Sequence, residues 1–251
     1  MKISVVIPVY NEVDSIPRLY KELNDVLSNL DWYEIFFIDD GSSDGSDKVI
    51  KKIIETNSKI NLIQFHRNYG KSAALAEGFK YADGDYVITM DSDLQDDPGE
   101  IPNLIKKLEE GYDLVSGWKK DRKDPISKKL PSKLFNFITR LFTGVKIHDF
   151  NCGLKIYQKS VIKTLELYGG RHRYIPAMAG QKKFKVSEII VNHRRRIHGK
   201  TKYGGSRLFH GLFDLISILF LSKYTQSPMY FFGKVGLLTF LFGIGIETYV
   251  I

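Results

Sequence analysis

The first 118 residues alternate between short apolar runs and stretches in which apolar residues recur every three or four positions. Five runs have the length and β-branched content of buried strands, at residues 3–9, 34–38, 61–65, 86–90 and 114–116. Four stretches between them have helical spacing, at residues 14–30, 46–54, 71–81 and 98–109. This alternation predicts an α/β fold with a mainly parallel sheet and helices on both faces.

The pattern is looser after residue 118. It predicts a helix at 127–142, a strand at 153–157, a helix at 159–167 and a strand at 184–191. We expect one α/β domain over residues 1–206, with a first half at 1–118 and a second half at 119–206. No internal repeat divides it further.

The C-terminal tail is strongly apolar. Residues 207–227 predict an amphipathic helix lying in a membrane interface, and residues 229–251, apolar apart from Lys234 and Glu247, predict a transmembrane segment. A buried helix of a soluble protein is the alternative. Only 17 residues run from Val235 to Ile251, near the lower limit for a span. We therefore expect the chain to stop within a larger membrane region.

Charge divides the chain in two. Up to Trp118 there are 12 Lys and Arg against 22 Asp and Glu, and beyond it 25 against 7, within a net charge of +8. The acidic half suits metal binding, and the basic half suits a polyanion. The apolar tail favours anionic lipid or a lipid phosphate over nucleic acid, and the Lys and Arg before it predict a cytoplasmic domain at the inner membrane.

The single cysteine, Cys152, excludes an intrachain disulfide, and we expect a small buried side chain.

Polar residues follow the predicted strands where each one ends. Asp91 and Asp93 directly follow the fourth strand, and carboxylate oxygens are ligands that Mg²⁺ or Mn²⁺ prefers. The carboxyl ends of parallel strands meet at one edge of the sheet. An aromatic ring from Tyr10 and carboxylates from Glu12 and Asp40 would join the pair there. This set matches a nucleoside diphosphate, and a solvated acidic loop is the simpler alternative.

Three motifs in this order resemble the signature of glycosyltransferase family 2, which has a GT-A fold. They are residues 5–12 (VVIPVYNE), 39–44 (DDGSSD) and 91–95 (DSDLQ). Residues 149–155, 172–176 and 199–203 are similar to one branch, the polyprenyl-phosphate glycosyltransferases, which includes dolichol-phosphate mannose synthase and bacterial undecaprenyl-phosphate glucosyltransferases. The resemblance covers essentially the whole chain. It departs at Lys119 and Lys120, where relatives often have arginine, and at Gly170, where they often have glutamate.

The resemblance implies a role for each motif residue. The residues implied to contact the nucleoside are Pro8, Tyr10, Glu12 and Asp40, and Lys71 is implied to lie near the nucleotide. Asp91, Asp93 and Gln95 are the implied ligands of Mg²⁺ or Mn²⁺, and the implied catalytic residues are Asp91, Asp93 and Asp149. Asp149 either positions sugar or acceptor or makes a structural hydrogen bond. We expect a surface or packing role for His172, His193 and His198, which do not form a metal set.

The implied reaction is inverting transfer of a hexose from a nucleotide diphosphate sugar to a polyprenyl phosphate. Glucose from UDP-glucose is the favoured donor sugar, with GDP-mannose as the other donor. A lipid monophosphate has a second pKa of about 6, so as an acceptor it needs no general base. It does need cations, and the candidates are Arg122, Lys129, Arg196, Lys200 and Lys202.

The motifs do not fit two other functions. A haloacid-dehalogenase-type phosphatase does not fit, because Gln95 occupies the last position of its motif. A processive polysaccharide synthase expects Gln-x-x-Arg-Trp, and neither Trp32 nor Trp118 follows an arginine. Two alternatives stay open: a family 2 transferase with a glycan or other hydroxyl acceptor, and a non-catalytic membrane-tethered nucleotide-binding module. A homo-oligomer is compatible with the sequence, and we expect a role in cell-envelope polysaccharide synthesis.

Overall fold

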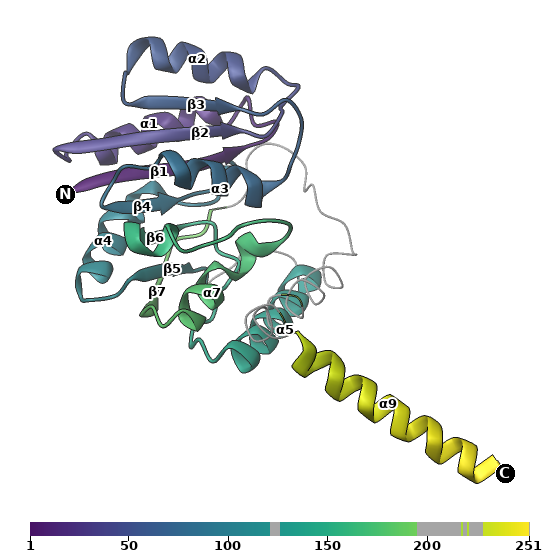
Figure 1. Cartoon of the computed structure of the whole chain (residues 1–251). Helices are drawn as coiled ribbons and strands as arrows, with labels where there is room; N and C mark the ends of the chain where they lie inside the picture. The colour runs from purple at the N-terminus through teal and green to yellow at the C-terminus, as the bar shows by residue number, and fades with distance from the viewer. Residues whose placement is uncertain (121–125, 195–216, 218–219, 221–227, 251) are drawn as a thin grey trace.

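A seven-stranded sheet forms the centre of the protein (Figure 1). The computed structural model describes residues 1–120, 126–194, 217, 220 and 228–250, and the side chains of residues 126–131 lie outside this description. The strands are β1 (Lys2–Val9), β2 (Trp32–Asp39), β3 (Ile60–Gln64), β4 (Tyr86–Thr89), β5 (Leu114–Trp118), β6 (Lys155–Gln158) and β7 (Val186–Ile190).

The described helices connect these strands in chain order. They are α1 (Ile16–Leu27), α2 (Ser46–Thr56), α3 (Lys71–Tyr81), α4 (Ile101–Glu109), α5 (Ile126–Thr143), α6 (Lys159–Ile162), α7 (Ile175–Gln181) and α9 (Met229–Val250). Two 3-10 turns, η1 (Pro98–Glu100) and η2 (Arg171–Tyr174), lead into α4 and α7.

The strand order is β3-β2-β1-β4-β6-β5-β7. Strands β1 to β4 are parallel where they pair, and β6 lies antiparallel between β4 and β5. Because β6 reverses direction and β5 reverses it again, the C-terminal ends of β1, β2, β4 and β5 lie at one edge. The polar motifs therefore meet at that edge, as the sequence predicts.

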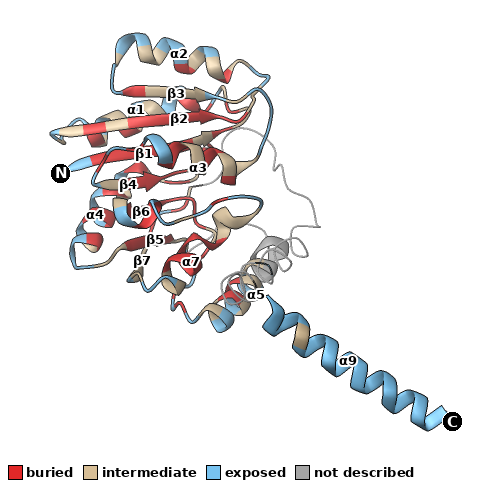
Figure 2. Ribbon diagram, viewed as in Figure 1, coloured by how far each residue is buried: buried red, intermediate tan, exposed pale blue. Residues whose placement is uncertain are grey.

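Two apolar clusters sandwich the sheet. Helices α1, α2 and α4 cover one face through residues such as Leu19, Ile50 and Leu104. Helices α3, α6 and α7 cover the other through residues such as Leu75, Val161 and Ile175. Figure 2 shows buried residues concentrated in the strands and on the inner faces of these helices. The expected α/β fold with helices on both faces is confirmed.

Most element boundaries differ from the expected ones by a few residues, and three of these differences concern the elements around the candidate site. Pro98 begins a 3-10 turn before α4, the helix expected to reach 167 ends at Ile162, and β6 begins at Lys155. Gly153, two residues before β6, lies close to the carboxylates of Asp91 and Asp96. The antiparallel direction of β6 was not predicted.

The helix α9 is the described part of the expected membrane segment. It has 22 residues, enough for about 33 Å at the α-helical rise, and none of them is buried. A core helix of a soluble protein would be mostly buried, so this alternative for residues 229–251 is disfavoured. The expected interfacial helix at 207–227 lies outside the described residues except for 217 and 220.

Candidate active site at the carboxyl edge of the sheet

The loops after β1 and β2 are tied together at this edge. The backbone N–H of Asn11 donates to Ser42 Oγ (2.9 Å), and that of Ser43 donates to Asn11 Oδ1 (2.8 Å). Asn11 has φ 52°, a left-handed conformation that asparagine adopts more readily than most residues. The N–H of Glu12 donates to Ser46 Oγ (3.0 Å). The two motifs thus form one rigid wall, with Pro8, Tyr10 and Glu12 along it.

Asp40 joins this wall to the N-terminus of α3. Its carboxylate is buried and accepts the backbone N–H groups of Tyr69 (2.7 Å) and Gly70 (2.9 Å). Burial raises the pKa of Asp40, and these two hydrogen bonds act in the opposite direction. Asp40 therefore holds the turn that begins α3. Its predicted contact with a base stays a prediction.

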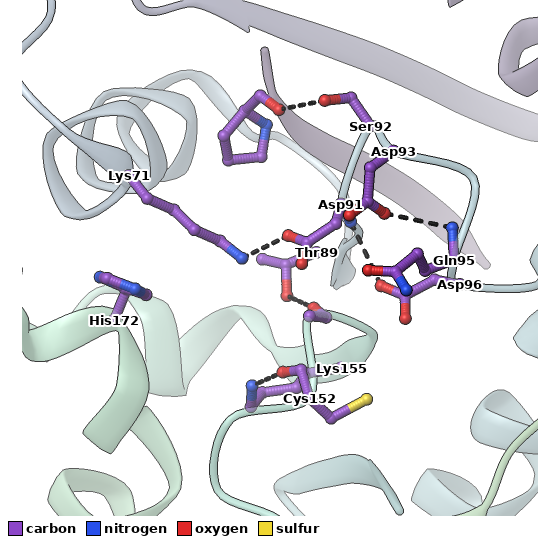
Figure 3. Close-up of polar contacts among 12 residues, drawn as sticks. Lys71, Thr89, Asp91, Ser92, Asp93, Gln95, Asp96, Cys152, Lys155 and His172 are labelled. Carbon is purple, nitrogen blue, oxygen red and sulfur yellow. Dashed lines mark hydrogen bonds and ion pairs between the residues drawn. The ribbon is translucent and has the colours of Figure 1, made fainter. Parts of the chain in front are cut away.

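Lys71, the first residue of α3, reaches across the edge to Asp91 after β4. The two side chains form a close ion pair, and Figure 3 shows them pointing toward one another. Burial alone would raise the pKa of Asp91, but Lys71 and Lys119 outweigh it and hold the pKa below its ordinary value. Asp91 is therefore ionised at neutral pH.

Asp93 and Gln95 form a tight turn beside Asp91. The N–H of Gln95 donates to Asp93 Oδ1 (3.1 Å), and Leu94 between them has φ 62°. The Gln95 amide nitrogen lies 3.5 Å from His193 Nε2, and the N–H of Arg194 donates to the Gln95 carbonyl (3.0 Å). The structure thus brings the three predicted metal ligands into one turn.

Gly153 leaves room for this cluster. A Cβ at Gly153 would lie 2.6 Å from Asp91 Oδ2 and 2.7 Å from Asp96 Oδ2. Its carbonyl accepts from Thr89 Oγ1 (2.9 Å), which fixes the glycine against β4. Only glycine fits here without displacing the side chains of Asp91 and Asp96, which Figure 3 shows.

A buried layer of lysines lies beneath the carboxylates. Lys119 forms an ion pair with Asp96 (2.8 Å), with the two side chains 11% and 0% exposed. Burial alone would lower the pKa of Lys119, but Asp96 raises it above its ordinary value. Lys155 donates to the carbonyl of Cys152 within the same layer. Cys152 is buried as expected, and burial raises its pKa to about 12.

The donor set at Asp91, Asp93 and Gln95 fits a hard divalent cation. All three side chains offer oxygen, which suits Mg²⁺ or Mn²⁺. Among the described residues no group of three or more His, Cys, Asp and Glu side chains gathers to form a closed metal site. Two carboxylates suffice where substrate phosphates complete the coordination shell. The site therefore suits a cation shared with a diphosphate.

Asp149 is buried, with 2% of its surface exposed. One of its carboxylate oxygens accepts the N–H of Asn151 (3.1 Å), so it closes the turn that leads to Gly153. This is the structural role that the sequence left open, and a catalytic role stays a prediction.

Of the predicted acceptor residues, Arg122, Arg196, Lys200 and Lys202 lie outside the described residues. Lys129 lies in α5, and its side chain is not described.

Three residues near the site were not assigned to it from the sequence. Lys119 and Asp96 have no signal that separates them from Lys120 and Asp97 beside them. His172 was expected only to pack or to lie on the surface. Its backbone N–H donates to Ser72 Oγ (3.0 Å), and its Nδ1 lies 2.9 Å from the same hydroxyl. Burial and the nearby Lys71 hold the pKa of His172 well below its ordinary value, so the imidazole is neutral.

Similar solved structures support the fold. Glucosyl-3-phosphoglycerate synthase from Mycobacterium tuberculosis, crystallised with Mn²⁺, uridine diphosphate and glucosyl-3-phosphoglycerate, aligns with a TM-score of 0.67 at 18% identity. The alignment covers 88% of this chain and 79% of that one. At this level of identity the likeness shows a shared GT-A fold.

Sequence comparison identifies the family. Residues 4–166 match the family described as Glycosyl transferase family 2. Dodecaprenyl-phosphate galacturonate synthase from Rhizobium johnstonii is 38% identical over 94% of this chain and 72% of its own length. Undecaprenyl-phosphate 4-deoxy-4-formamido-L-arabinose transferase from Pseudomonas syringae pv. syringae is 36% identical over 96% of this chain and 71% of its own length. The chain therefore belongs to glycosyltransferase family 2, and within it to the branch of polyprenyl-phosphate sugar transferases.

Proposed function

We propose that the protein transfers a sugar from a nucleotide diphosphate sugar to a polyprenyl phosphate at the cytoplasmic face of the inner membrane. The observation that carries this proposal is the close ion pair of Asp91 with Lys71, beside the Asp93–Gln95 turn at the carboxyl edge of the sheet. The relatives, named for transfer to dodecaprenyl and undecaprenyl phosphate, support the acceptor. The apolar helix α9, of which no residue is buried, supports the membrane location.

The donor lies across the wall formed by the β1 and β2 loops in this proposal. Pro8, Tyr10 and Glu12 line the base and ribose, with Asp40 behind them. Asp91, Asp93 and Gln95 would hold Mg²⁺ or Mn²⁺, which when bound neutralises charge on a diphosphate. Lys71 lies beside Asp91 and supplies a second positive charge toward the departing diphosphate.

The acceptor phosphate acts directly as the nucleophile. One of its oxygens bonds to the anomeric carbon as the bond from that carbon to the diphosphate oxygen breaks, which inverts the configuration. A monophosphate with a second pKa of about 6 is largely deprotonated at pH 7, so no side chain has to remove a proton. The predicted cations Arg122, Lys129, Arg196, Lys200 and Lys202 position it, and Asp149 supports the turn beneath the site.

The identity of the transferred sugar is a separate part of the proposal. The two relatives are named for galacturonate and for 4-deoxy-4-formamido-L-arabinose, so the branch accepts sugars of different chemistry. We propose a hexose donor, with UDP-glucose as the first to test and GDP-mannose beside it. UDP-galacturonate and a UDP-pentose complete the panel because of the relatives.

A donor panel tests this function directly. The full chain in membranes is incubated with each radiolabelled donor, undecaprenyl phosphate and either Mg²⁺, Mn²⁺ or a chelator. We expect one donor to yield a chloroform-extractable product that needs the cation. Transfer to a soluble hydroxyl acceptor, with no lipid product from any donor, would favour a glycan-type acceptor. Donor binding without transfer would favour a non-catalytic module.

A further inference from the structure

His172 and Ser72 join the second half of the chain to the first half beside the candidate active site. His172 lies in η2, and Ser72 is the second residue of α3, directly after Lys71. The backbone N–H of His172 donates to Ser72 Oγ (3.0 Å), and the ring Nδ1 lies 2.9 Å from the same hydroxyl. One serine hydroxyl thus contacts both the backbone and the ring of His172, and this fixes the ring relative to α3.

These two contacts determine which nitrogen of the ring carries the proton. Ser72 is buried, and within the described part of the chain His172 is the hydrogen-bond partner of its hydroxyl. The oxygen already accepts the backbone N–H, and a buried hydroxyl also has to donate its own hydrogen. Nδ1 is the acceptor that it reaches, so in the neutral ring the proton lies on Nε2.

The surroundings of the ring keep it neutral. Desolvation contributes most to lowering the pKa of His172, and the charges of Lys71 and Arg173 lower the pKa further. The charge of Asp91 acts in the opposite direction but does not outweigh them. At neutral pH the ring therefore offers one uncharged N–H donor, at Nε2.

This donor is available to a ligand beside the ion pair of Lys71 and Asp91. Nε2 points away from Ser72, because the two nitrogens of an imidazole ring face outward in different directions. Among the described residues none accepts a hydrogen bond from Nε2, and His172 is partly exposed. In Figure 3 the ring lies on the Lys71 side of Asp91, opposite to Asp96.

The charge of the ring favours a sugar over a phosphate as this ligand. Phosphate oxygens are anionic and are bound best by cations, and Lys71 already supplies one here. A phosphate beside the ring would favour the charged imidazolium, which desolvation and Lys71 disfavour. An uncharged N–H donor suits an uncharged oxygen. In a nucleotide diphosphate sugar, the sugar hydroxyls are the uncharged oxygens next to the diphosphate.

We propose that the Nε2 N–H of His172 donates a hydrogen bond to an oxygen of the transferred sugar, and that Ser72 holds the ring in the orientation this requires. The inference rests on the proposed function, because it needs a nucleotide diphosphate sugar bound beside Lys71 and Asp91. A site with such a donor should distinguish the nucleotide sugar from the bare nucleoside diphosphate, which lacks the sugar oxygen.

Two substitutions of His172 separate the roles of its two ring nitrogens. The amide of asparagine occupies the place of Nδ1, so His172→Asn can keep the contact with Ser72 but removes the donor at Nε2. The longer side chain of glutamine reaches the place of Nε2, so His172→Gln can keep the donor. His66→Asn, at an exposed histidine, is the matched control.

Binding measurements on the full chain in detergent with Mn²⁺ test the proposal. Isothermal titration compares UDP-glucose, GDP-mannose and UDP-galacturonate with UDP and GDP, and the nucleotide sugar that the parent binds most tightly is used. We expect His172→Asn to weaken binding of that sugar about fivefold to tenfold, the size of one uncharged hydrogen bond, with the matching nucleoside diphosphate within about twofold of the parent. His172→Gln and His66→Asn should both stay within about twofold for each ligand.

A smaller loss with the same selectivity is expected for Ser72→Ala, because the ring keeps its donor but loses its fixed orientation. Thermal unfolding of each variant shows whether it is folded. Parental affinity of His172→Asn for the nucleotide sugar would overturn the proposal. Equal weakening of the nucleotide sugar and of the nucleoside diphosphate would also overturn it, because the ring would then support the whole nucleotide site.

The same titrations separate this inference from the proposed function. Sugar-specific weakening in a protein that transfers sugar to no acceptor would contradict the proposed transfer and leave the role of His172 standing. Normal transfer with an unchanged affinity in His172→Asn would do the opposite. A parent protein that binds none of the nucleotide sugars would contradict both.

Discussion

Lys71 places a positive charge on the side of the site where the diphosphate of the donor would bind. Its ammonium group contacts Asp91 and lowers the pKa of that carboxyl. We expect Lys71→Met to lower kcat/KM by about 100-fold, the usual loss when one group that stabilises developing charge is removed. Lys80→Met, on the same helix but exposed and paired with Glu77, is the matched control. Steady-state transfer assays check this, and equal activity in both variants would remove Lys71 from the mechanism.

Gly153 tests whether the carboxylates must keep their present positions. A Cβ there would lie 2.6 Å from Asp91 Oδ2, well inside van der Waals contact. Gly153→Ala should destabilise the protein by about 1–3 kcal/mol through overpacking and reduce transfer by displacing Asp91. Gly233→Ala, where a Cβ meets nothing within 4 Å, is the control. Thermal unfolding and activity measured together decide the matter, and a variant with parental values for both would contradict the packing argument.

His172 links stability to pH with a definite sign. Its pKa is well below the ordinary value of about 6.5 because the ring is largely desolvated and lies near Lys71. The unfolded chain then binds a proton that the folded chain does not, so stability is lost as pH falls below about 6.5. Between pH 7.5 and 5.5, His172→Asn should lose less stability than the parent, by up to about 1.4 kcal/mol per pH unit. Thermal unfolding of both proteins across this range checks it, and identical slopes would contradict the prediction.

At the scale of elements, the first half of the chain was largely predictable and the second half was not. Strands β1, β2 and β4 are continuous apolar runs that stop at polar motifs, so both the strands and the meeting of their ends follow from the sequence. Strand β6 has only four residues and begins with the buried Lys155. Nothing local separates an antiparallel insertion from another parallel strand.

The candidate site shows the same division. Asp91, Asp93 and Gln95 share one turn and follow from a short motif. Lys119 and Asp96 come from separate segments that only the sheet order brings together. Partners of that kind depend on tertiary structure, and a pattern read along the chain does not contain them.

The ion pair of Asp96 and Lys119 joins the β4–α4 loop to the end of β5. Removing one partner leaves the other charge buried and unpaired, so Lys119→Met should cost about 3–5 kcal/mol of unfolding free energy. Asp96→Asn together with Lys119→Met should recover part of that loss, because the uncompensated charge is gone. Denaturant unfolding of the singles and the double gives the coupling energy. Strictly additive losses would contradict a direct pairing.

For the whole molecule, charge and topology indicate where the two substrates of the proposed reaction would bind. The acidic first half carries the donor-side motifs, and the basic second half precedes the apolar α9. The sheet gathers the donor motifs at one edge, and α5 begins shortly beyond β5 at that same edge. Under the proposed function, the donor and the membrane-bound acceptor would then meet at this edge.

The position of α9 in the membrane provides the last prediction. With Lys and Arg concentrated before it, the domain should lie on the cytoplasmic side and residue 251 toward the other side. A membrane-impermeant maleimide should label Lys52→Cys in inverted inner-membrane vesicles but not in right-side-out vesicles, and buried Cys152 should give no signal. A cysteine appended after Ile251 should show the opposite pattern. If both cysteines label from the same side, α9 lies along the membrane instead of crossing it. The labelling pattern does not depend on which sugar the protein transfers, so it tests the architecture independently of the chemistry.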